Sequence, residues 1–251
     1  MNNQFDISRF WKFMKLQLFK NRKGVFMIMA ITFGMLFFVG FMLSVFLEHP
    51  EAYDHTESYV SALLMGGFII SSLAFSETDR VLKRIGYLML PISNLERFIC
   101  MWLLTSIGWL IVFTISFTIY ALIANPIGNL VFPATSFKVF NPFGAIARQT
   151  MLLYVALQGI FLLGAAYFRK YVLPKTMISI FIILGIVGLV LYFSLKEQFL
   201  ADHYCTTEDE CELVDAFAVH PVWYMAKGLF WFALAPLTWI LSYWGLKEQE
   251  A

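Results

Sequence analysis

Charged residues are scarce in this chain of 251 residues: Asp, Glu, Lys and Arg make up 14% of it, whereas 60% of the residues are hydrophobic. A soluble domain usually carries charge on about a quarter of its residues. The 18 Lys and Arg nearly balance the 17 Asp and Glu, so the sequence predicts no basic surface for nucleic acid. The shortage of charge therefore indicates a chain that lies mostly within a membrane.

Motifs for catalysis and for nucleotide binding are also absent. The sequence contains no Gly-x-Ser-x-Gly run, no His-Glu-x-x-His run and no pair of carboxylates within an apolar stretch, so no catalytic site is indicated. It also lacks the loop Gly-x-x-x-x-Gly-Lys-Ser/Thr that cradles nucleotide phosphates. We therefore expect that the chain is not an enzyme and holds no cofactor, metal ion or ATP of its own.

The three cysteines and four histidines show no metal-binding spacing such as Cys-x-x-Cys. Cys100 begins an apolar stretch and is interpreted as an inert apolar residue. Cys205 and Cys211 share an acidic loop with five residues between them, which predicts a disulfide in an oxidising compartment. Free thiols and a metal site are the alternatives for this pair. Solvated side chains are expected for the histidines, which all fall between apolar stretches: His49, His55, His203 and His220.

Most of the chain consists of apolar stretches that are long enough for a helix to cross a bilayer, which takes about 20 residues. There are six of them, at 25–47, 58–75, 98–123, 149–168, 172–195 and 222–245. A helix satisfies its own backbone polar groups in lipid. The sequence therefore predicts an all-α membrane protein with six transmembrane helices in a single domain, 1–251. The first stretch is too long for the apolar core of a signal peptide, so we expect it to be retained.

Lys and Arg alternate between rich and poor connections along the chain. The rich ones hold six in 1–24, four in 76–97, three in 169–175 and one in the tail after 245. The poor ones hold none in 48–57, two in 124–148 and one in 196–221. Because cytoplasmic connections carry the excess of positive charge, both termini are predicted to be cytoplasmic and the loop 196–221 to lie outside.

Residues 7–20 predict a helix of a different kind. Apolar residues recur there at helical spacing, namely Ile7, Phe10, Trp11, Met14 and Leu18. Basic residues occupy its other faces, namely Arg9, Lys12, Lys15 and Lys20. Such a basic amphipathic helix is typical of a segment lying on the anionic inner leaflet. Contact with a cytoplasmic partner is the alternative reading.

Small residues recur about four positions apart in the second stretch, which lets helix backbones approach closely in lipid. They are Ala62, Gly66, Gly67 and Ser71, and Gly185 with Gly188 can act likewise in the fifth stretch. Gln158 is the most polar residue at depth and is expected to hydrogen-bond a neighbouring helix. Pro126, Pro133 and Pro142 predict that 124–147 forms a folded cap and not a continuous helix.

The inner loop 76–97 is the most informative polar segment. Charges crowd its first half, at Glu77, Arg80, Lys83 and Arg84, and residues 88–92 then form an apolar turn. Ser93 precedes Glu96 by three positions, the spacing of a capping box that begins a helix. An exposed apolar turn on a cytoplasmic loop usually binds a lipid surface or a groove on another protein.

From Glu77 through Gly86 to Leu90-Pro91-Ile92-Ser93 and Glu96, this loop resembles the one after the second span of type-2 ATP-binding-cassette exporter permeases. Its second half, from Leu90 to Phe98, is similar to the corresponding loop of permease-like proteins of Bacteroidota. This similarity implies that the chain lies in a bacterial inner membrane. The resemblance implies two six-span subunits, as a homodimer or pseudo-dimer, above separate cassette ATPase subunits that bind ATP. It also implies which residues couple to the ATPase: Glu77, Arg80, Lys83, Arg84, Gly86, Leu88, Leu90, Pro91, Ser93 and Glu96.

Two other classes remain open for this sequence. A non-transporting membrane scaffold or assembly factor equally explains the lack of charge at membrane depth. A membrane-embedded enzyme or metal-handling protein is the third reading. If the chain transports, its apolar interior favours lipid-like, peptide or drug-like cargo over a small ion.

Overall fold

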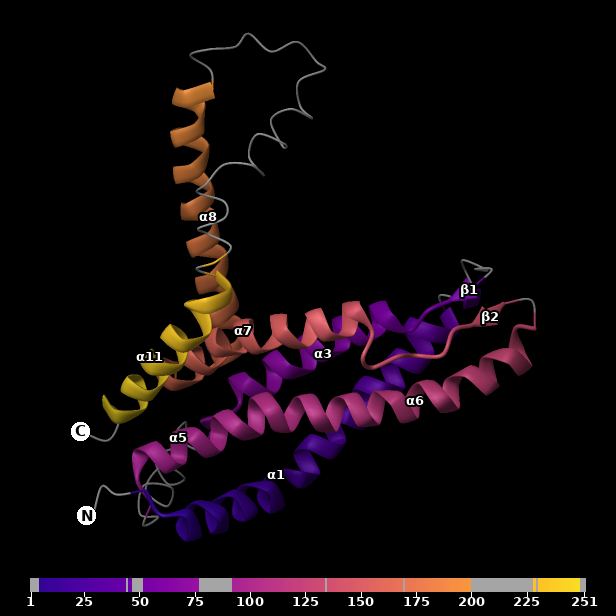
Figure 1. Ribbon diagram of the computed structural model, residues 1–251, viewed down its shortest axis with the longest axis horizontal. Helices are drawn as coiled ribbons and strands as arrows, with labels where there is room; N and C mark the ends of the chain where they lie inside the picture. The colour runs from indigo at the N-terminus through magenta and orange to yellow at the C-terminus, as the bar shows by residue number, and fades with distance from the viewer. Residues whose placement is uncertain are drawn as a thin grey trace.

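The computed structural model describes residues 5–43, 45–46, 52–76, 92–133, 135–168, 170–199, 228 and 230–248. These residues are mostly helical, with one pair of very short strands. In chain order the elements are α1 (Ile7–Met35), the π-helix η1 (Leu36–Leu43), β1 (Ala52–Tyr53), α3 (Thr56–Ser72), α5 (Asn94–Leu103), the π-helix η3 (Leu104–Gly108), α6 (Trp109–Val131), β2 (Ser136–Phe137), α7 (Ala145–Tyr167), α8 (Val172–Phe199) and α11 (Leu234–Glu248). Figure 1 shows a long bundle from which α8 stands out.

Four helical stretches of the described chain are long and apolar enough to cross a membrane: Ile7–Val39, Asn94–Val131, Ala145–Tyr167 and Val172–Leu189. The prediction of a helical membrane protein is confirmed to the extent of these four helical stretches. Helices also occupy the second and sixth predicted spans, but their described lengths are only 17 residues in α3 and 15 in α11. The count of six spans therefore stays a prediction.

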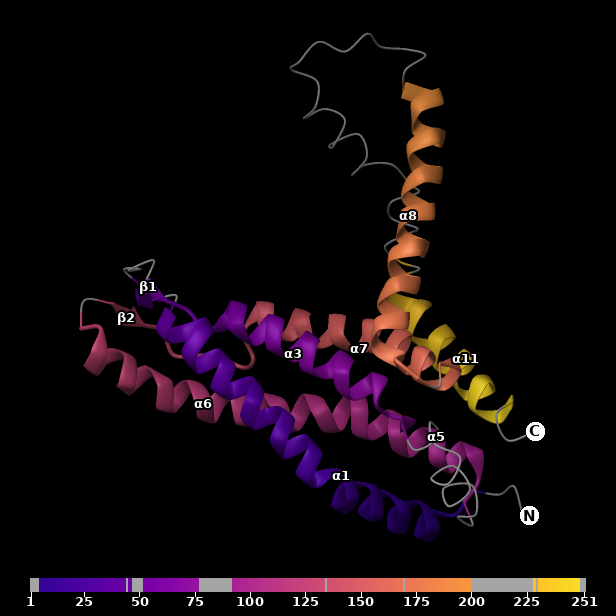
Figure 2. The same cartoon turned by 180° about the vertical axis from the view of Figure 1, so that it is seen from behind.

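The start of α1 and the end of α11 lie at the same end of the molecule, and the strand pair lies at the other (Figure 1, and from behind in Figure 2). We call the first the inner end and the second the outer end. Between these two ends α1, α3, α5–α6 and α7 run in alternating directions, and α11 packs along α7.

The predicted surface helix 7–20 and the first predicted span form one continuous helical stretch as far as Leu43, through α1 and η1. α1 begins after Asp6, whose carboxylate accepts a hydrogen bond from the backbone N–H of Ser8 at 2.8 Å. One Gly inside a helix costs only about 1 kcal/mol, so Gly24 does not interrupt it. The predicted apolar stripe is divided: Met14 is buried in the bundle, whereas Ile7, Trp11 and Leu18 are exposed.

Close packing through small residues is confirmed for α3. A Cβ added to Gly66 would lie 2.6 Å from Cζ2 of Trp109, and one added to Gly67 would overlap the ring of Tyr154. These two positions let α3 fit against α6 and α7. In α8, by contrast, a Cβ added to Gly185 or Gly188 would meet nothing within 4 Å.

Helix α8 has an apolar surface that the described part of the chain leaves uncovered. Tyr171 adopts the left-handed backbone conformation, with φ of 55°, where the chain turns from α7 into α8. In both views α8 then projects away from the bundle (Figures 1 and 2). Most of its apolar side chains from Ile178 to Leu189 are exposed. A surface of this kind is expected to contact lipid or another protein chain.

The predicted helix break at Pro126 is wrong, because α6 passes through this residue and ends at Val131. Membrane helices tolerate Pro where nearby groups compensate for the lost backbone hydrogen bond. The chain then returns through β2, which pairs in parallel with β1, Ala52 opposite Ser136. The side chain of Asn125 joins this cap, since its Nδ2 donates to the backbone oxygen of Lys138 at 3.2 Å.

The expectation of a solvated side chain is wrong for His55, which is fully buried at the outer end. Its ring lies 4.9 Å from that of Tyr53 and 5.5 Å from that of Phe41, centroid to centroid. Its Nε2 hydrogen-bonds Oδ1 of Asn125 at 2.8 Å. Burial lowers the pKa of His55 below its usual 6.5, although the Asn125 hydrogen bond and the Asp54 charge oppose the shift. The other three histidines lie outside the described residues.

This depressed pKa predicts a pH-dependent contribution of His55 to stability. The contribution is full above about pH 6.5 and falls as the pH is lowered toward the folded-state pKa, because only the unfolded chain then takes up a proton. Thermal unfolding in detergent between about pH 7.5 and about pH 5.5 measures it. The His55→Gln chain should lose this part of the pH dependence. Equal pH dependence in both chains would contradict the assignment, since the other histidines are common to both.

Candidate functional site

Two of the predicted coupling residues, Ser93 and Glu96, fall within the described chain. The others lie outside it: Glu77, Arg80, Lys83, Arg84, Gly86, Leu88, Leu90 and Pro91. The predicted disulfide partners, Cys205 and Cys211, lie outside it as well. The site can therefore be built from the point where the inner loop ends and α5 begins.

The predicted capping box is confirmed at the start of α5. The hydroxyl of Ser93 accepts a hydrogen bond from the backbone N–H of Glu96 at 3.3 Å. In return, Oε2 of Glu96 accepts one from the backbone N–H of Ser93 at 3.0 Å. Two backbone donors that a helix start leaves unpaired are thus satisfied, which stabilises the first turn.

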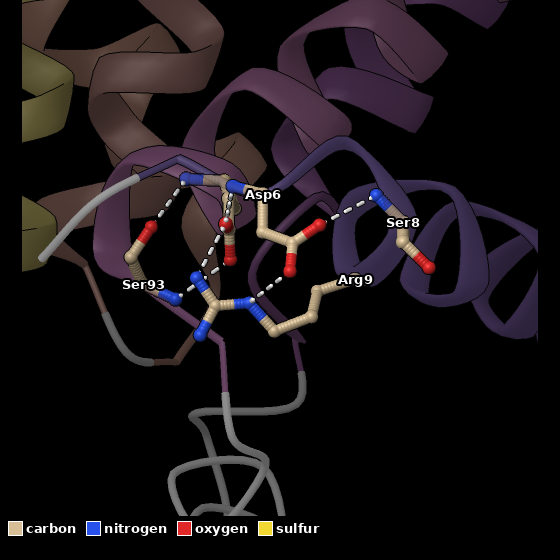
Figure 3. Close-up of polar contacts among 5 residues, drawn as sticks. Asp6, Ser8, Arg9 and Ser93 are labelled. Atoms are coloured by element: carbon tan, nitrogen blue, oxygen red, sulfur yellow. Dashed lines mark hydrogen bonds and ion pairs between the residues drawn. The ribbon is translucent and has the colours of Figure 1, made fainter. Parts of the chain in front are cut away.

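The second carboxylate oxygen of Glu96 joins α5 to the start of α1. Its Oε1 accepts a hydrogen bond from the backbone N–H of Asp6 at 2.7 Å and another from Nη2 of Arg9 at 3.0 Å. Nε of Arg9 also lies 3.8 Å from the Asp6 carboxylate. Figure 3 shows Asp6, Arg9 and Ser93 converging from the two helix starts. We call Asp6, Arg9, Ser93 and Glu96 the inner junction.

The burial of Glu96 makes these contacts energetically important. Its side chain has no exposed surface, whereas that of Arg9 is about one-third exposed, at 34%. An unpaired buried charge is costly, so the carboxylate requires the donors that surround it. Glu96 is therefore not exposed on the surface of this chain. Its hydrogen bonds hold the end of the inner loop against the start of α1.

Apolar packing continues the inner junction into the bundle. Phe13 and Met14 of α1 form one buried cluster with Ile92 and Cys100. Cys100 is a free, buried thiol, in agreement with its interpretation as an apolar residue. The start of α1 is thus held to α5 by a polar contact at its tip and by side-chain packing along the next two turns.

Sequence reasoning identified Ser93 and Glu96 but missed Asp6 and Arg9 as their partners. The distance along the chain, 90 residues from Asp6 to Glu96, hides the contact. One signal was available: Asp6 stands directly before a helical pattern with Arg9 three positions later, as a helix cap and its ion-pair partner do.

A second polar cluster lies deeper, at the π-helix η3. Nε2 of Gln158 donates to Oγ1 of Thr105 at 3.0 Å, which confirms the predicted hydrogen bond between helices. Tyr154 donates to the backbone oxygen of Thr105. Within the described chain, Oε1 of Gln158 and Oγ of Ser106 are buried without a hydrogen-bond partner. π-Helical turns often accompany functional sites, and this one turns polar groups into the bundle.

No group of three or more metal-ligating side chains is present among the described residues. No family model matches the sequence, and searches of curated proteins and of solved structures return no match. The inner junction and the cluster at η3 are therefore interpreted from their own geometry.

Replacing Glu96 with Gln tests the inner junction. The amide keeps the shape of the side chain but loses the charge and one of the two acceptor oxygens, so the donors of Asp6, Arg9 and Ser93 cannot all be satisfied. We expect a loss of about 2 kcal/mol in unfolding free energy, as for hydrogen bonds to charged groups. Thermal or denaturant unfolding in detergent measures it.

Glu57→Gln is the matched control, because Glu57 is an exposed acid in the first turn of α3. It should change stability by less than about 0.5 kcal/mol. If the two variants lose equal stability, the carboxylate of Glu96 does not hold the junction together.

Proposed function

We propose that this chain is the membrane permease subunit of an ATP-driven exporter of the type-2 ATP-binding-cassette class. ATP binding and hydrolysis would belong to a separate cassette ATPase, consistent with the absence of a phosphate-binding loop from this sequence. In this proposal the chain has six spans, with both termini on the cytoplasmic side of a bacterial inner membrane.

The inner junction is the observation that supports this proposal most. A force applied to the inner loop 76–97 reaches α5 directly, because α5 begins at the end of that loop. It reaches α1 as well, because Glu96 binds Asp6 and Arg9. Two membrane helices would therefore move together when a cytoplasmic partner pushes the loop, as a coupling element requires.

The proposed contacts with the ATPase are made by the part of the loop before Ser93. Its acidic and basic residues, Glu77, Arg80, Lys83 and Arg84, would form the polar rim of the contact. Gly86 and the apolar turn with Leu88, Leu90 and Pro91 would follow, seated in a groove of the ATPase. Ser93 and Glu96 would transmit the motion.

A second subunit is also part of the proposal, as a homodimer or a pseudo-dimer with a related permease. The uncovered apolar side chains of α8 supply a surface for it. Gly185 and Gly188 would allow a helix of the second subunit to approach α8 closely, because glycine has no side chain. The space beside both residues is open to such a helix, since a Cβ added at either position meets nothing within 4 Å.

Replacing Leu90 with Asp tests the proposed ATPase contact. If Leu90 is buried in the contact, an unpaired carboxylate there should lower the affinity for the ATPase roughly 30-fold or more. Charge reversal of Lys83 on the rim should have a smaller, salt-dependent effect. Co-purification of the ATPase measures association, and stimulation of its ATP hydrolysis is the second readout.

Val139→Asp is the control, since Val139 is 79% exposed near the strand pair at the outer end. It adds the same charge and should leave association unchanged. Unchanged association and stimulation in a well-inserted Leu90→Asp protein would rule out the loop as the docking site. If no cassette ATPase co-purifies with the native chain, the membrane-scaffold function replaces this proposal.

A further inference from the structure

A cavity of about 570 Å³ opens between the inner halves of three helical passes. Its walls come from α1, from the end of α3 and from the continuous stretch α5–η3–α6. Most of the lining side chains are apolar, including Met29, Leu104 and Trp109. This volume is in the range of small-molecule and cofactor sites.

The length of the cavity matches one leaflet of a bilayer. On α1 the lining runs from Gln17 to Met29, and at 1.5 Å per residue this is about 18 Å. Half of a bilayer, including its polar headgroup region, is about 20 Å thick. An acyl chain entering at the inner end would therefore lie along α1 and finish near Trp109 and Val112, in the middle of the membrane.

Polar and positive groups gather at the inner end of the cavity. Lys20 and Arg22 line it there, together with the amides of Gln17 and Asn21. None of the described lining residues is acidic. The guanidinium of Arg22 lies 3.9 Å from the centroid of the Phe19 ring, a cation–π contact within α1.

Gly24 keeps the wall of the cavity open on α1. It shares a helical face with Gln17, Asn21 and Ile28, all of which line the cavity. A Cβ added at this position would meet nothing within 4 Å. A larger side chain at Gly24 can therefore enter the cavity without a clash with the described protein.

We propose that this cavity binds one acyl chain of an anionic phospholipid from the inner leaflet, with the phosphate beside Lys20 and Arg22. The apolar walls would accept the chain, and the guanidinium of Arg22 at the inner end favours a negative headgroup. The proposal rests on the membrane location of the helices and on the predicted cytoplasmic orientation of the inner end, and it does not depend on the exporter function. The bound lipid would lie between α1 and the continuous stretch α5–η3–α6, whose start the inner junction joins to α1.

Native mass spectrometry of the delipidated full chain in detergent tests this site, with phosphatidylglycerol and phosphatidylcholine as probes. The native protein should retain phosphatidylglycerol more tightly. Gly24→Leu should lower the affinity for both lipids by about tenfold or more, because the leucine occupies the space of the chain. Gly34→Leu is the control, since a Cβ at Gly34 also meets nothing within 4 Å but this residue does not line the cavity.

The headgroup contact is tested separately with Arg22→Gln. Losing one cation should lower the affinity for phosphatidylglycerol on the order of fivefold and leave that for phosphatidylcholine unchanged. Lys247→Gln, at an exposed cation of α11 outside the cavity lining, should leave both affinities unchanged. Thermal unfolding of each variant verifies that it is folded.

Three results would overturn the proposal. Equal lipid retention by folded Gly24→Leu and Gly34→Leu would show that no chain lies in the cavity. An unchanged preference for phosphatidylglycerol in Arg22→Gln would show that the phosphate binds elsewhere. If Gly24→Leu instead converts a dimer to a monomer, with no effect on lipid, the cavity is an interface between two copies of this chain.

Discussion

A buried carboxylate must be paired, and this requirement at Glu96 fixes the inner end of the molecule. Its two oxygens accept from Asp6, Arg9 and Ser93, which belong to segments about 90 residues apart in the sequence. Once these donors converge, the first turns of α1 and α5 lie side by side. Their apolar side chains then pack beneath, and α1 and the stretch α5–η3–α6 also form two of the walls of the cavity.

In the membrane-spanning part of the molecule, the bilayer favours apolar side chains on the outer surface and polar side chains in the interior. Polar groups at membrane depth are turned inward, as Thr105 and Gln158 show at η3. Large apolar side chains remain on the outside of α1 and α8, where lipid or a second subunit can cover them. The proposed coupling element and the proposed lipid site are compatible with this arrangement, because both lie toward the inner end of the molecule.

Local patterns in the sequence predicted local structure well. The spacing of Ser93 and Glu96 predicted the capping box, because its two hydrogen bonds span only three residues. The role of Arg9 depends on a contact with a residue 87 positions away in the sequence, which no local pattern carries. Burial of His55 likewise depends on aromatic rings brought together by the strand pair. The helix continues through Pro126, because a single Pro is tolerated in a membrane helix, whereas in water it usually ends one.

The central claim is that Glu96 makes the start of α1 and the start of α5 one mechanical unit. The distance between spin labels at Ser8 and Leu95 tests it most directly, since both residues are exposed and each stands beside the inner junction. The native cysteines would be replaced first. We expect a narrow distance distribution when Glu96 is present and a broad one in Glu96→Gln. A distribution that stays equally narrow in Glu96→Gln would contradict it.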